Sequence, residues 1–319
     1  MTGFSLIIPT YNRDAYLRKT LQSLNELIVP PNVRCEVLVI DNNCQDNTQQ
    51  VVAEAADRHR LSIRRILETR QGLSYARNRG LDEAAEEMIV YLDDDILINP
   101  KWISGCMQLL QDFQVDAVVG PIYPLFEQDP PDHMHGRALD MISSGYSRRG
   151  EVPALLPQSK AHELTGCNFG VTRKMAEKLQ GFNLHLGRIG DRLLAGEDWD
   201  FGIRLVAAGG RTAYHPDCSI QHVMVTKKMT KEYLRERAWE SGVTARQMGT
   251  GPRSMLTSIV GQLGASRKWS QAILYKLFGH REAFNAELGA RESGGYWWGN
   301  LRTASPKTHL PSPVNLKHE

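Results

Sequence analysis

Short apolar runs alternate along the first two thirds of the chain with longer segments in which apolar residues recur every three or four positions. The runs are typical of strands buried on both faces, and the longer segments of amphipathic helices. The predicted strands are 4–10, 35–41, 61–67, 88–92, 116–120, 166–171 and 218–223. The predicted helices are 14–24, 47–59, 74–87, one that begins at Pro100, 173–179 and 197–208. This alternation predicts an α/β fold in which right-handed βαβ units build a sheet with helices on both faces.

The run 88–92 ends in three consecutive carboxylates, Asp93, Asp94 and Asp95. A buried parallel strand would deliver them to the C-terminal edge of the sheet, where open α/β sheets bind ligands. Neighbouring carboxylates repel one another, and a hard cation such as Mg²⁺ or Mn²⁺ stabilises them together. The alternative is a polar loop with solvated acids, which is the usual meaning of an isolated acidic triplet. The strand 35–41 also ends in a carboxylate, Asp41, at the same predicted edge.

Two common nucleotide-binding signatures are missing after the first strand. The sequence there has neither the GxGxxG fingerprint nor a GxxxxGK[ST] phosphate loop, so dehydrogenases and P-loop nucleotidases fit poorly. A nucleotidyltransferase would need a Gly-rich, Arg-containing phosphate loop at this point, and the segment 9–13 is not such a loop.

Two segments interrupt the alternation of strands and helices. The segment 123–158 is rich in Pro, Gly, His and Ser and predicts a long irregular excursion, and loops of that length are commonly functional or mobile. The Gly-rich segment 181–196 carries Arg188 and Arg192 and leads into a helix that begins with several acids. Acids at a helix start usually serve only as caps or as partners of the helix dipole.

Charge divides the 319-residue chain into two unequal parts. The segment from Lys227 to the end holds 15 Lys and Arg against 7 Asp and Glu, a net charge of +8, so the preceding part carries −6. Segments 230–248 and 255–278 have helical spacing with basic residues between the apolar ones, and four of the six tryptophans lie in this basic part. Such helices suit an anionic membrane interface. The alternative is that they pack on the rest of the protein and their basic faces are solvated.

Other features of the chain bear on its compartment. No signal peptide is expected, because the first apolar run begins at Phe4 with no basic region before it. No apolar stretch approaches the ~20 residues of a membrane-spanning helix. Five scattered cysteines without a CxxC pair indicate a reducing cytoplasm, with neither structural zinc nor disulfides. No fold signature of nucleic-acid binding accompanies the basic segment. We therefore expect a cytoplasmic protein with possible peripheral contact at the inner face of a membrane.

Several short motifs occur in a fixed order along the chain. They are IPTYNR at 8–13, a strand ending in Asp41, GLSYARN at 72–78, LDDD at 92–95, GED at 196–198, and then Pro216 and His222. Together they resemble the family 2 glycosyltransferases of the GT-A fold over about residues 4–226. The resemblance implies a Rossmann-like, mostly parallel sheet with flanking helices, to which this chain adds a C-terminal helical extension.

The resemblance, together with the composition of the C-terminal part, predicts a division of the chain into functional parts. The catalytic domain would span 1–226, with a nucleotide-binding half at about 1–120 and an acceptor-binding half at about 160–226. A basic, Trp-containing helical extension at 227–302 and a flexible tail at 303–319 would follow.

The resemblance also implies a role for each matching position. The sugar donor would contact Pro9, Thr10, Tyr11, Asp41, Arg77, Asp93, Asp94, Asn168 and Arg188. Asp95 and His222 would bind Mn²⁺ or Mg²⁺, and Asp198 would be the catalytic base. Arg188 and Arg192 would clamp phosphates or an anionic acceptor. The alternatives are a turn cap for Asp41, a solvated helix charge for Arg77, a structural role for His222 and surface charge for Arg188 and Arg192. Arg70 departs from the family pattern, which often has Asn there.

The activity that follows is metal-dependent, inverting transfer of a sugar from a nucleoside diphosphate sugar, expected to be UDP-linked. The acceptor would be a glycan or a lipid-linked molecule in polysaccharide or glycoconjugate synthesis. In such a reaction a carboxylate takes the proton of the acceptor hydroxyl, and a metal neutralises the leaving diphosphate. The competing hypothesis is a non-catalytic GT-A-like module that binds nucleotide or glycan. Such a module would be expected to lack acids like Asp95 and Asp198, which this chain retains.

Overall fold

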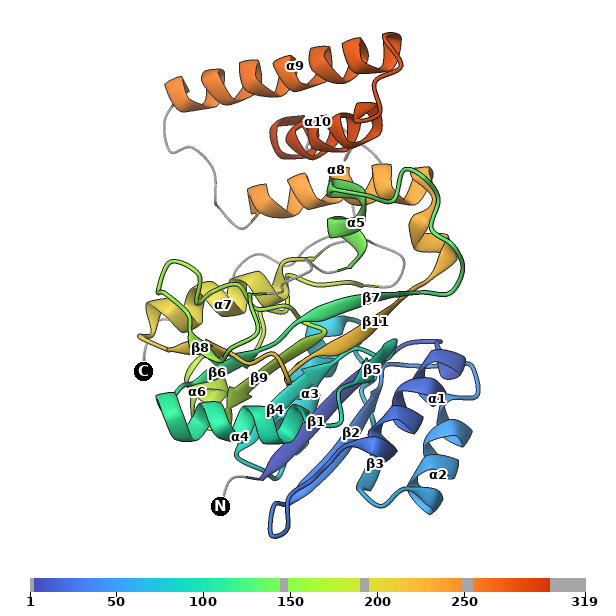
Figure 1. Cartoon of the computed structure of the whole chain (residues 1–319), viewed down its shortest axis with the longest axis vertical. Coiled ribbons are helices and arrows are strands. Elements are labelled where there is room, and N and C mark those ends of the chain that lie inside the picture. Colours follow the sequence, from blue (N-terminus) through green and yellow to red (C-terminus); the bar gives the residue numbers. More distant parts are fainter. Residues whose placement is uncertain (1–2, 144–148, 190–194, 248–254, 299–319) are drawn as a thin grey trace.

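A mixed β-sheet with helices on both faces forms the body of the protein, and a layer of further helices lies above it in Figure 1. The structure is a computed structural model that describes residues 3–143, 149–189, 195–247 and 255–298. Arg192 and the predicted tail 303–319 lie outside these residues. Among the described residues, no helix is both long and apolar enough to cross a membrane.

The N-terminal half of the large sheet is parallel. Its strands, in spatial order, are β3 (Ser62–Leu67), β2 (Cys35–Asp41), β1 (Phe4–Thr10) and β4 (Met88–Leu92). The connecting helices are α1 (Asp14–Ser23), α2 (Thr48–Arg58) and α3 (Leu73–Glu83). Every residue of β1 and β4 is buried. Thr10 pairs with Asp41 at the C-terminal edge, and β4 delivers Asp93 to that edge, as the apolar runs predict.

Successive residues of β1 face opposite layers of the core. Leu6 and Ile8 pack with α1, α2 and α4 (Trp102–Phe113), whereas Ile7 packs with α3, α6 (Arg173–Lys178) and α7 (Glu197–Ala207). A strand alternates its side chains between the two faces of a sheet, so an uninterrupted apolar run is stable only between two helical layers. A methyl group on Gly80 of α3 would lie 2.4 Å from the Ile7 side chain, which shows how closely that helix approaches.

The second half of the sheet introduces an antiparallel strand. Strand β9 (Asn168–Thr172) runs antiparallel between β4 and β6 (Ala117–Val119). Strands β10 (Thr212–Tyr214) and β8 (Ala154–Leu155) complete the far edge. In β9, a Cβ on Gly170 would lie 2.6 Å from Met88 and 3.2 Å from the buried Trp102 ring, so a glycine lets these side chains close over the strand.

A smaller sheet crosses the acidic end of β4. Strand β11 (Ile220–Met224) lies between β5 (Ile96–Ile98) and β7 (Ile122–Phe126). His222 pairs in register with Ile96, and the Val223 amide donates a hydrogen bond to the Asp95 carbonyl at 2.8 Å. This pairing brings His222 beside the acidic triplet although more than 120 residues separate them.

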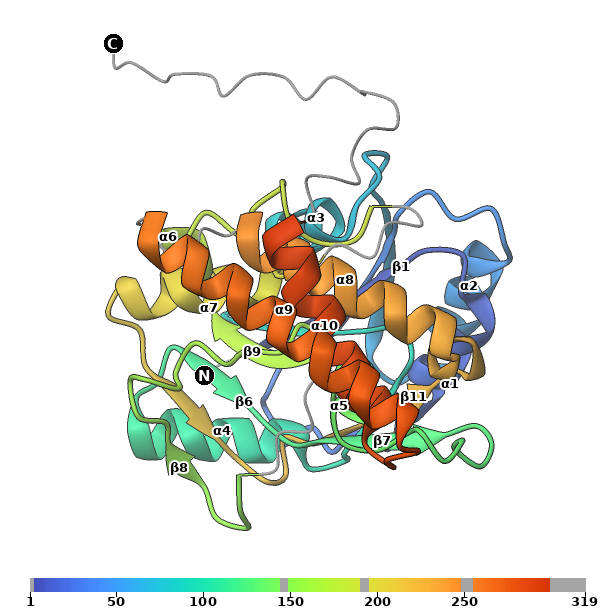
Figure 2. The same cartoon turned by 90° about the horizontal axis from the view of Figure 1, so that it is seen from above.

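The C-terminal extension consists of α8 (Lys231–Gln247), α9 (Met255–Leu277) and α10 (Ala283–Trp298), with α10 between the other two (Figure 1). Viewed from above, these helices lie across the α/β body (Figure 2). A Cβ on Gly242 would lie 1.8 Å from the Glu292 carbonyl, and one on Gly295 would lie 2.0 Å from the Trp239 carbonyl. The two glycines therefore allow the backbones of α8 and α10 to touch.

The extension shares an apolar core with the body. Ala138 and Ile142 of α5 (Arg137–Ile142) pack with Leu234 and Ala238 of α8 and with Leu288 of α10. Helix α5 lies within the segment 123–158 that the sequence predicted to be irregular, as do β8 and most of β7, so that prediction was wrong in part. Strands β10 and β5 were also not predicted, and helix α10 lies within the predicted helical extension 227–302 although its bounds were not predicted.

Helix α3 ends at Glu83, four residues earlier than its apolar spacing predicted. Ala84 is extended, and the Glu36 carboxylate accepts a hydrogen bond from the Ala85 amide at 2.7 Å. The Ser5 hydroxyl accepts one from the Glu86 amide at 3.1 Å. Side chains of β1 and β2 thus bind the amides that a longer helix would have used itself.

Candidate active site

A pocket of about 600 Å³ lies at the C-terminal edge of the large sheet, below α5 and α8. Pockets of this size commonly hold small-molecule ligands. The sequence-predicted residues that line it are Pro9, Thr10, Tyr11, Arg77, Asp93, Asp94, Arg188, Asp198 and His222. They come from both halves of the predicted catalytic domain.

At one end of the pocket, Asp93, Asp95 and His222 can each offer a ligand atom within 4.8 Å of the others. Asp95 and His222 are buried, and Asp95 Oδ1 lies 3.1 Å from His222 Nε2. The two atoms are not aligned for a hydrogen bond, and neither has a hydrogen-bond partner among the residues that the structure describes. Buried polar atoms rarely stay unsatisfied. Because carboxylate oxygens and imidazole suit Mn²⁺, this donor set fits a divalent ion.

Cations from the same pocket balance the acidic triplet. Arg13 donates to Asp94 at 2.9 Å and to Asp95 at 2.7 Å, and Lys228 lies 3.1 Å from Asp95. Burial raises the pKa of Asp94 to about 6. Burial alone would also raise the pKa of Asp95, but Lys228, His222 and Arg13 outweigh it and hold that pKa well below its usual range. Sequence reasoning did not single out Arg13 or Lys228, although Arg13 stands in the motif directly after β1.

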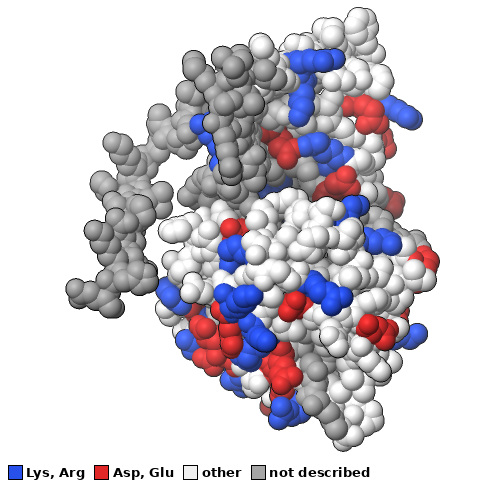
Figure 3. All heavy atoms as spheres, turned by 90° about the vertical axis from the view of Figure 1, so that its left-hand side faces the viewer, with Lys and Arg blue, Asp and Glu red and all other residues white. Residues whose placement is uncertain are grey.

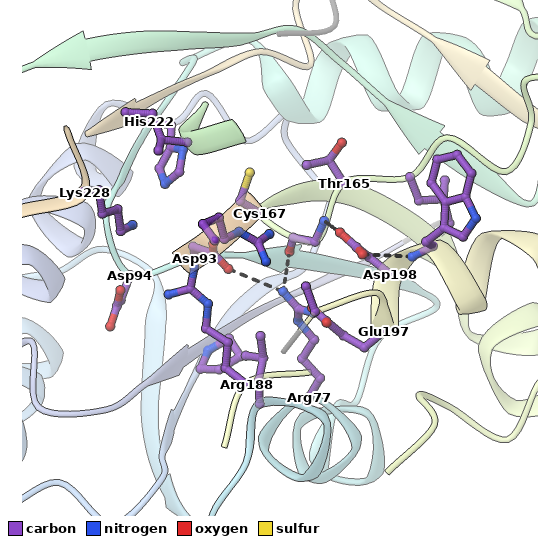
Figure 4. Close-up of a pocket in the computed structure, with 18 of the residues that line it drawn as sticks. Arg77, Asp93, Asp94, Thr165, Cys167, Arg188, Glu197, Asp198, His222 and Lys228 are labelled. Atoms are coloured by element: carbon purple, nitrogen blue, oxygen red, sulfur yellow. Dashed lines mark hydrogen bonds and ion pairs between the residues drawn. The ribbon is translucent and has the colours of Figure 1, made fainter. Parts of the chain in front are cut away.

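Arg77 links Asp93, at the end of the pocket where a metal ion would fit, to Glu197 at the opposite end. Its buried guanidinium pairs with Glu197 at 2.7 Å, lies 3.4 Å from Asp93 and donates to the Gly166 carbonyl at 3.0 Å (Figure 4). A Cβ on Gly166 would come within 2.4 Å of the guanidinium, so only glycine fits there. The alternative of a solvated helix charge is therefore wrong. The guanidinium also lies over the Phe182 ring, with 5.2 Å between them.

Asp198 lies at the N-terminal end of α7, on the side of the pocket away from His222 and Lys228 (Figure 4). Each of its carboxylate oxygens accepts one backbone hydrogen bond of 2.8 Å, from Gly166 and from Trp199. Removal from water, with the charge of Glu197, raises the pKa of Asp198 to about 6, while Arg77 opposes the shift. A carboxylate with that pKa is largely ionised at pH 7 and can accept a proton.

Two of the predicted donor-binding residues do not line the pocket. Asp41 is buried, accepts the Cys44 amide at 2.8 Å and pairs with Arg65 at 2.6 Å, so a nucleobase would have to compete with partners within the chain. Asn168 receives a hydrogen bond from the Trp102 indole at 2.9 Å and donates to the Cys218 carbonyl at 2.9 Å. Asn168 thus ties β9 to helix α4 and to the segment before β11, and the structure does not bring it to the pocket.

Strand β1 and the turn after it build part of the pocket. The Thr10 hydroxyl donates to Asp94 at 2.8 Å, which fixes the carboxylate beside the motif. Pro9 and Tyr11 line the same wall, and the Tyr11 side chain is partly exposed. Arg188 also lines the pocket, and the structure adds α8 residues that sequence reasoning missed, among them Tyr233 and Arg237. No local motif marks these α8 positions.

Residues 5–180 match the family model described as glycosyl transferase family 2. The chain belongs to this family. The succinoglycan biosynthesis protein ExoM of Rhizobium meliloti is 28% identical over 240 residues, which cover 74% of this chain and 71% of that protein. The validoxylamine A glucosyltransferase of Streptomyces hygroscopicus is 28% identical over 64% of this chain, but this spans only 48% of the relative. A Campylobacter jejuni GalNAc(5)-diNAcBac-PP-undecaprenol beta-1,3-glucosyltransferase is 33% identical over 34% of each chain.

Solved structures of other glycosyltransferases share the fold of this family 2 member. The mannosyltransferase PcManGT of Pyrobaculum calidifontis, in complex with GDP-Man and Mn²⁺, superposes with a TM-score of 0.61 at 18% identity and covers 92% of this chain and 87% of its own. TarS 1-349 of S. aureus, in complex with UDP-GlcNAc, gives a TM-score of 0.56 at 15% identity, with 94% and 92% covered. The predicted GT-A fold is thereby confirmed.

Proposed function

We propose that the protein is an inverting, metal-dependent glycosyltransferase that moves a sugar from a nucleoside diphosphate sugar, UDP-linked, to a glycan or lipid-linked acceptor. The observation that carries the proposal is the layout of one pocket. A donor set that fits Mn²⁺, Asp93 with Asp95 and His222, lies at one end, and a carboxylate with a pKa of about 6, Asp198, lies at the other. The space between them has room for a sugar.

The reaction requires few groups. The acceptor oxygen forms a bond to the anomeric carbon as the bond from that carbon to the diphosphate oxygen breaks, and attack from the opposite face inverts the carbon. Asp198 accepts the proton of the acceptor hydroxyl, while the Gly166 and Trp199 amides keep its carboxylate oriented. Asp93, Asp95 and His222 would hold the metal ion, which when bound neutralises charge on the leaving diphosphate. Arg13 and Lys228 place two further cations in the same pocket.

Relatives and structural neighbours support the substrate classes. ExoM is named for succinoglycan biosynthesis, and the Campylobacter jejuni relative for a PP-undecaprenol-linked glycan. The neighbours bind GDP-Man with Mn²⁺ in one case and UDP-GlcNAc in the other. We infer a role in polysaccharide or glycoconjugate synthesis in the cytoplasm, with a UDP-sugar as the donor to test first.

Peripheral contact with a membrane is part of this proposal. Helix α9 and the turn after it expose Leu263, Ile273, Leu274, Leu277 and Phe278. Positions 263, 274 and 277 share one side of the helix, since they differ by nearly whole turns. The face in Figure 3 mixes Lys and Arg with Asp and Glu and carries no continuous basic field. An interface with anionic lipid would involve the apolar strip of α9, with Arg267 one turn from Leu263 on the same side.

A screen of nucleotide-sugars tests the proposed function. Each UDP- and GDP-sugar is added to the full chain with and without Mn²⁺, and the melting temperature and the release of nucleotide are measured. A ligand that binds only the folded state stabilises it by RT ln(1 + [L]/K_d). We expect stabilisation by one donor only when metal is present. If one donor binds with metal but no acceptor or water ever takes its sugar, the binding-module hypothesis becomes the better one.

A further inference from the structure

Helix α8 of the extension forms one wall of the active-site pocket. Tyr233, Arg237 and Ser241 all line the pocket. They are four residues apart, so they share one face of the helix. The adjacent positions Leu234 and Ala238 are buried in the apolar core with α5 and α10, which fixes how α8 presents that face.

Arg188 meets this wall from the loop before α7. It is half-buried, and its guanidinium lies 3.4 Å from the Tyr233 hydroxyl. Within the described part of the chain, it forms no ion pair with a carboxylate. Four other basic residues of the pocket do pair with a carboxylate among the described residues. They are Arg13, Arg77, Arg149 and Lys228. Arg188 thus differs from them in carrying a charge that no acid of the described chain contacts directly.

Arg237 adds a second positive charge beside Arg188. Burial lowers the pKa of Arg237, and the charge of Arg188 lowers it further, while Glu197 and Asp198 oppose the shift. Two guanidinium groups held close together in a half-buried wall repel each other, and an anion between them would relieve this repulsion. Guanidinium groups match the geometry of phosphate and carboxylate oxygens with paired hydrogen bonds.

The position of Arg237 indicates which substrate supplies the anion. Arg237 lines the pocket together with Glu197 and Asp198 and feels their charges, so it lies on the side of the proposed base. Arg188 feels the charges of Asp93 and Glu197, so it lies between that side and the acids that fit a metal. The acids that fit a metal, and Lys228 with them, occupy the other end. The acceptor must bring its hydroxyl to Asp198, whereas the diphosphate of the donor must lie near the metal.

Resting on the proposed function, we propose that Arg188 and Arg237 form an oxyanion subsite for the acceptor, so that the enzyme takes an acceptor that carries a phosphate or carboxylate near its attacking hydroxyl. The Tyr233 and Ser241 hydroxyls supply further hydrogen-bond donors at the same wall. Two sources carry the required chemistry, a lipid-linked phosphate group and the carboxylate of an acidic sugar.

Calorimetric titration of the full chain tests the subsite. The protein is first saturated with UDP and Mn²⁺, and then geranyl diphosphate, methyl glucuronide or methyl glucoside is added. One anionic probe should bind, and the neutral glucoside should bind at least ~10-fold more weakly. Preference for the diphosphate indicates a lipid-linked acceptor, and preference for the glucuronide an acidic glycan. If neither anionic probe binds better than the glucoside, the proposal is wrong.

Matched variants locate the binding. Arg237→Gln and Arg188→Gln should each weaken the anionic probe at least ~10-fold, and Arg237→Lys should restore part of the affinity. Arg235→Gln is the control, because Arg235 lies on the same helix but pairs with Glu287 of α10 at 2.8 Å. Melting temperatures show whether each variant folds. Equal probe binding by Arg237→Gln and the parent protein would overturn the subsite.

UDP binding separates this proposal from the function on which it rests. If Arg237→Gln loses UDP and the anionic probe to the same extent, the anion belongs to the donor, and the acceptor subsite is wrong. If the parent protein fails to bind any nucleotide with metal, the proposed function fails instead. Titration of the anionic probes without nucleotide then still measures the arginine pair.

Discussion

The N-terminal half of the large sheet and the C-terminal extension contribute to the same pocket in different ways. In the first half, buried strands carry acids directly to the sheet edge, so the position of Asp93 follows from the direction of β4. In the extension, Arg237 reaches the pocket only because α8 is held by α10 and α5. One half places its chemistry by local chain direction, and the other by tertiary packing. The α8 wall is therefore the part of the pocket that small changes in packing can alter.

The largest effect is expected from Asp198→Asn, which tests the site where the two regions meet. The variant cannot accept the acceptor's proton, so transfer should slow at least ~100-fold, while UDP and Mn²⁺ bind nearly as in the parent protein. The amide can replace only one of the two oxygens that accept backbone N–H groups, so a small loss of melting temperature is also expected.

Initial rates and calorimetry measure the two effects separately. Unchanged transfer by Asp198→Asn would move the role of base to another carboxylate. Glu197 and Asp200 are the nearest candidates, but Glu197 pairs with Arg77 at 2.7 Å and Asp200 with Arg204 at 2.8 Å. Asp200→Asn is therefore the matched control, and we expect it to keep most of the activity.

Asp95→Asn tests the contribution of the nucleotide half alone. The amide lacks the charge that a divalent ion needs, so affinity for UDP with Mn²⁺ should fall at least ~10-fold and lose its dependence on metal. Arg13 and Lys228 lose part of their buried partner, so the melting temperature should also fall. Asp57→Asn, at an exposed position of α2, is the control. Metal-dependent UDP binding that equals the parent's would contradict the metal site.

The pH dependence of sugar transfer tests the role of Asp198 as the base without any substitution. Burial raises the pKa of Asp198 to about 6, and the carboxyl must lose its proton before it can act. Activity should therefore rise with pH, level off above about pH 6, and fall about tenfold for each unit below that value. Rates at saturating donor, with the fold checked by circular dichroism, measure this. A profile that stays flat down to pH 4.5 would be inconsistent with Asp198 as the base.

The difference between the two regions also explains what the sequence could predict. The delivery of Asp93 to Asp95 to the sheet edge and the position of Asp198 at a helix start follow from the apolar runs and the helix-start pattern. The partners of these groups do not, because the contact between Arg77 and Glu197 joins residues 120 positions apart. Asn168 shows where prediction from the sequence fails. The adjacent residue Cys167 lines the pocket, whereas the Asn168 side chain forms hydrogen bonds with Trp102 and Cys218.

Gly242→Ala should weaken the extension and leave the nucleotide half intact. The added methyl group would meet the Glu292 backbone at 1.8 Å, and backbone cannot move aside cheaply, so we expect a loss of about 1–3 kcal/mol in stability. Gly264→Ala is the control, since nothing lies within 4 Å of its added methyl group, and it should gain ~0.5–1 kcal/mol of helix propensity. Chemical denaturation followed by Trp fluorescence measures both. Equal stability of the two variants would show that α8 and α10 do not touch as described.

The smallest effect is expected at the outer surface of the extension, in a Leu274→Ser, Leu277→Ser, Phe278→Ser variant. These side chains are 52%, 74% and 83% exposed, so their loss should barely change the melting temperature. If α9 lies on anionic lipid, sedimentation with phosphatidylserine vesicles should fall several-fold, because apolar burial and charge act together in such helices. Raising the salt from 0.1 M to 1 M shortens the Debye length from ~10 Å to ~3 Å and should weaken the parent's binding as well. Leu67→Ser, half-exposed at the end of β3, is the control and should sediment like the parent. Equal sedimentation with neutral and anionic vesicles, or none with either, would confine the role of the extension to the acceptor wall of the pocket.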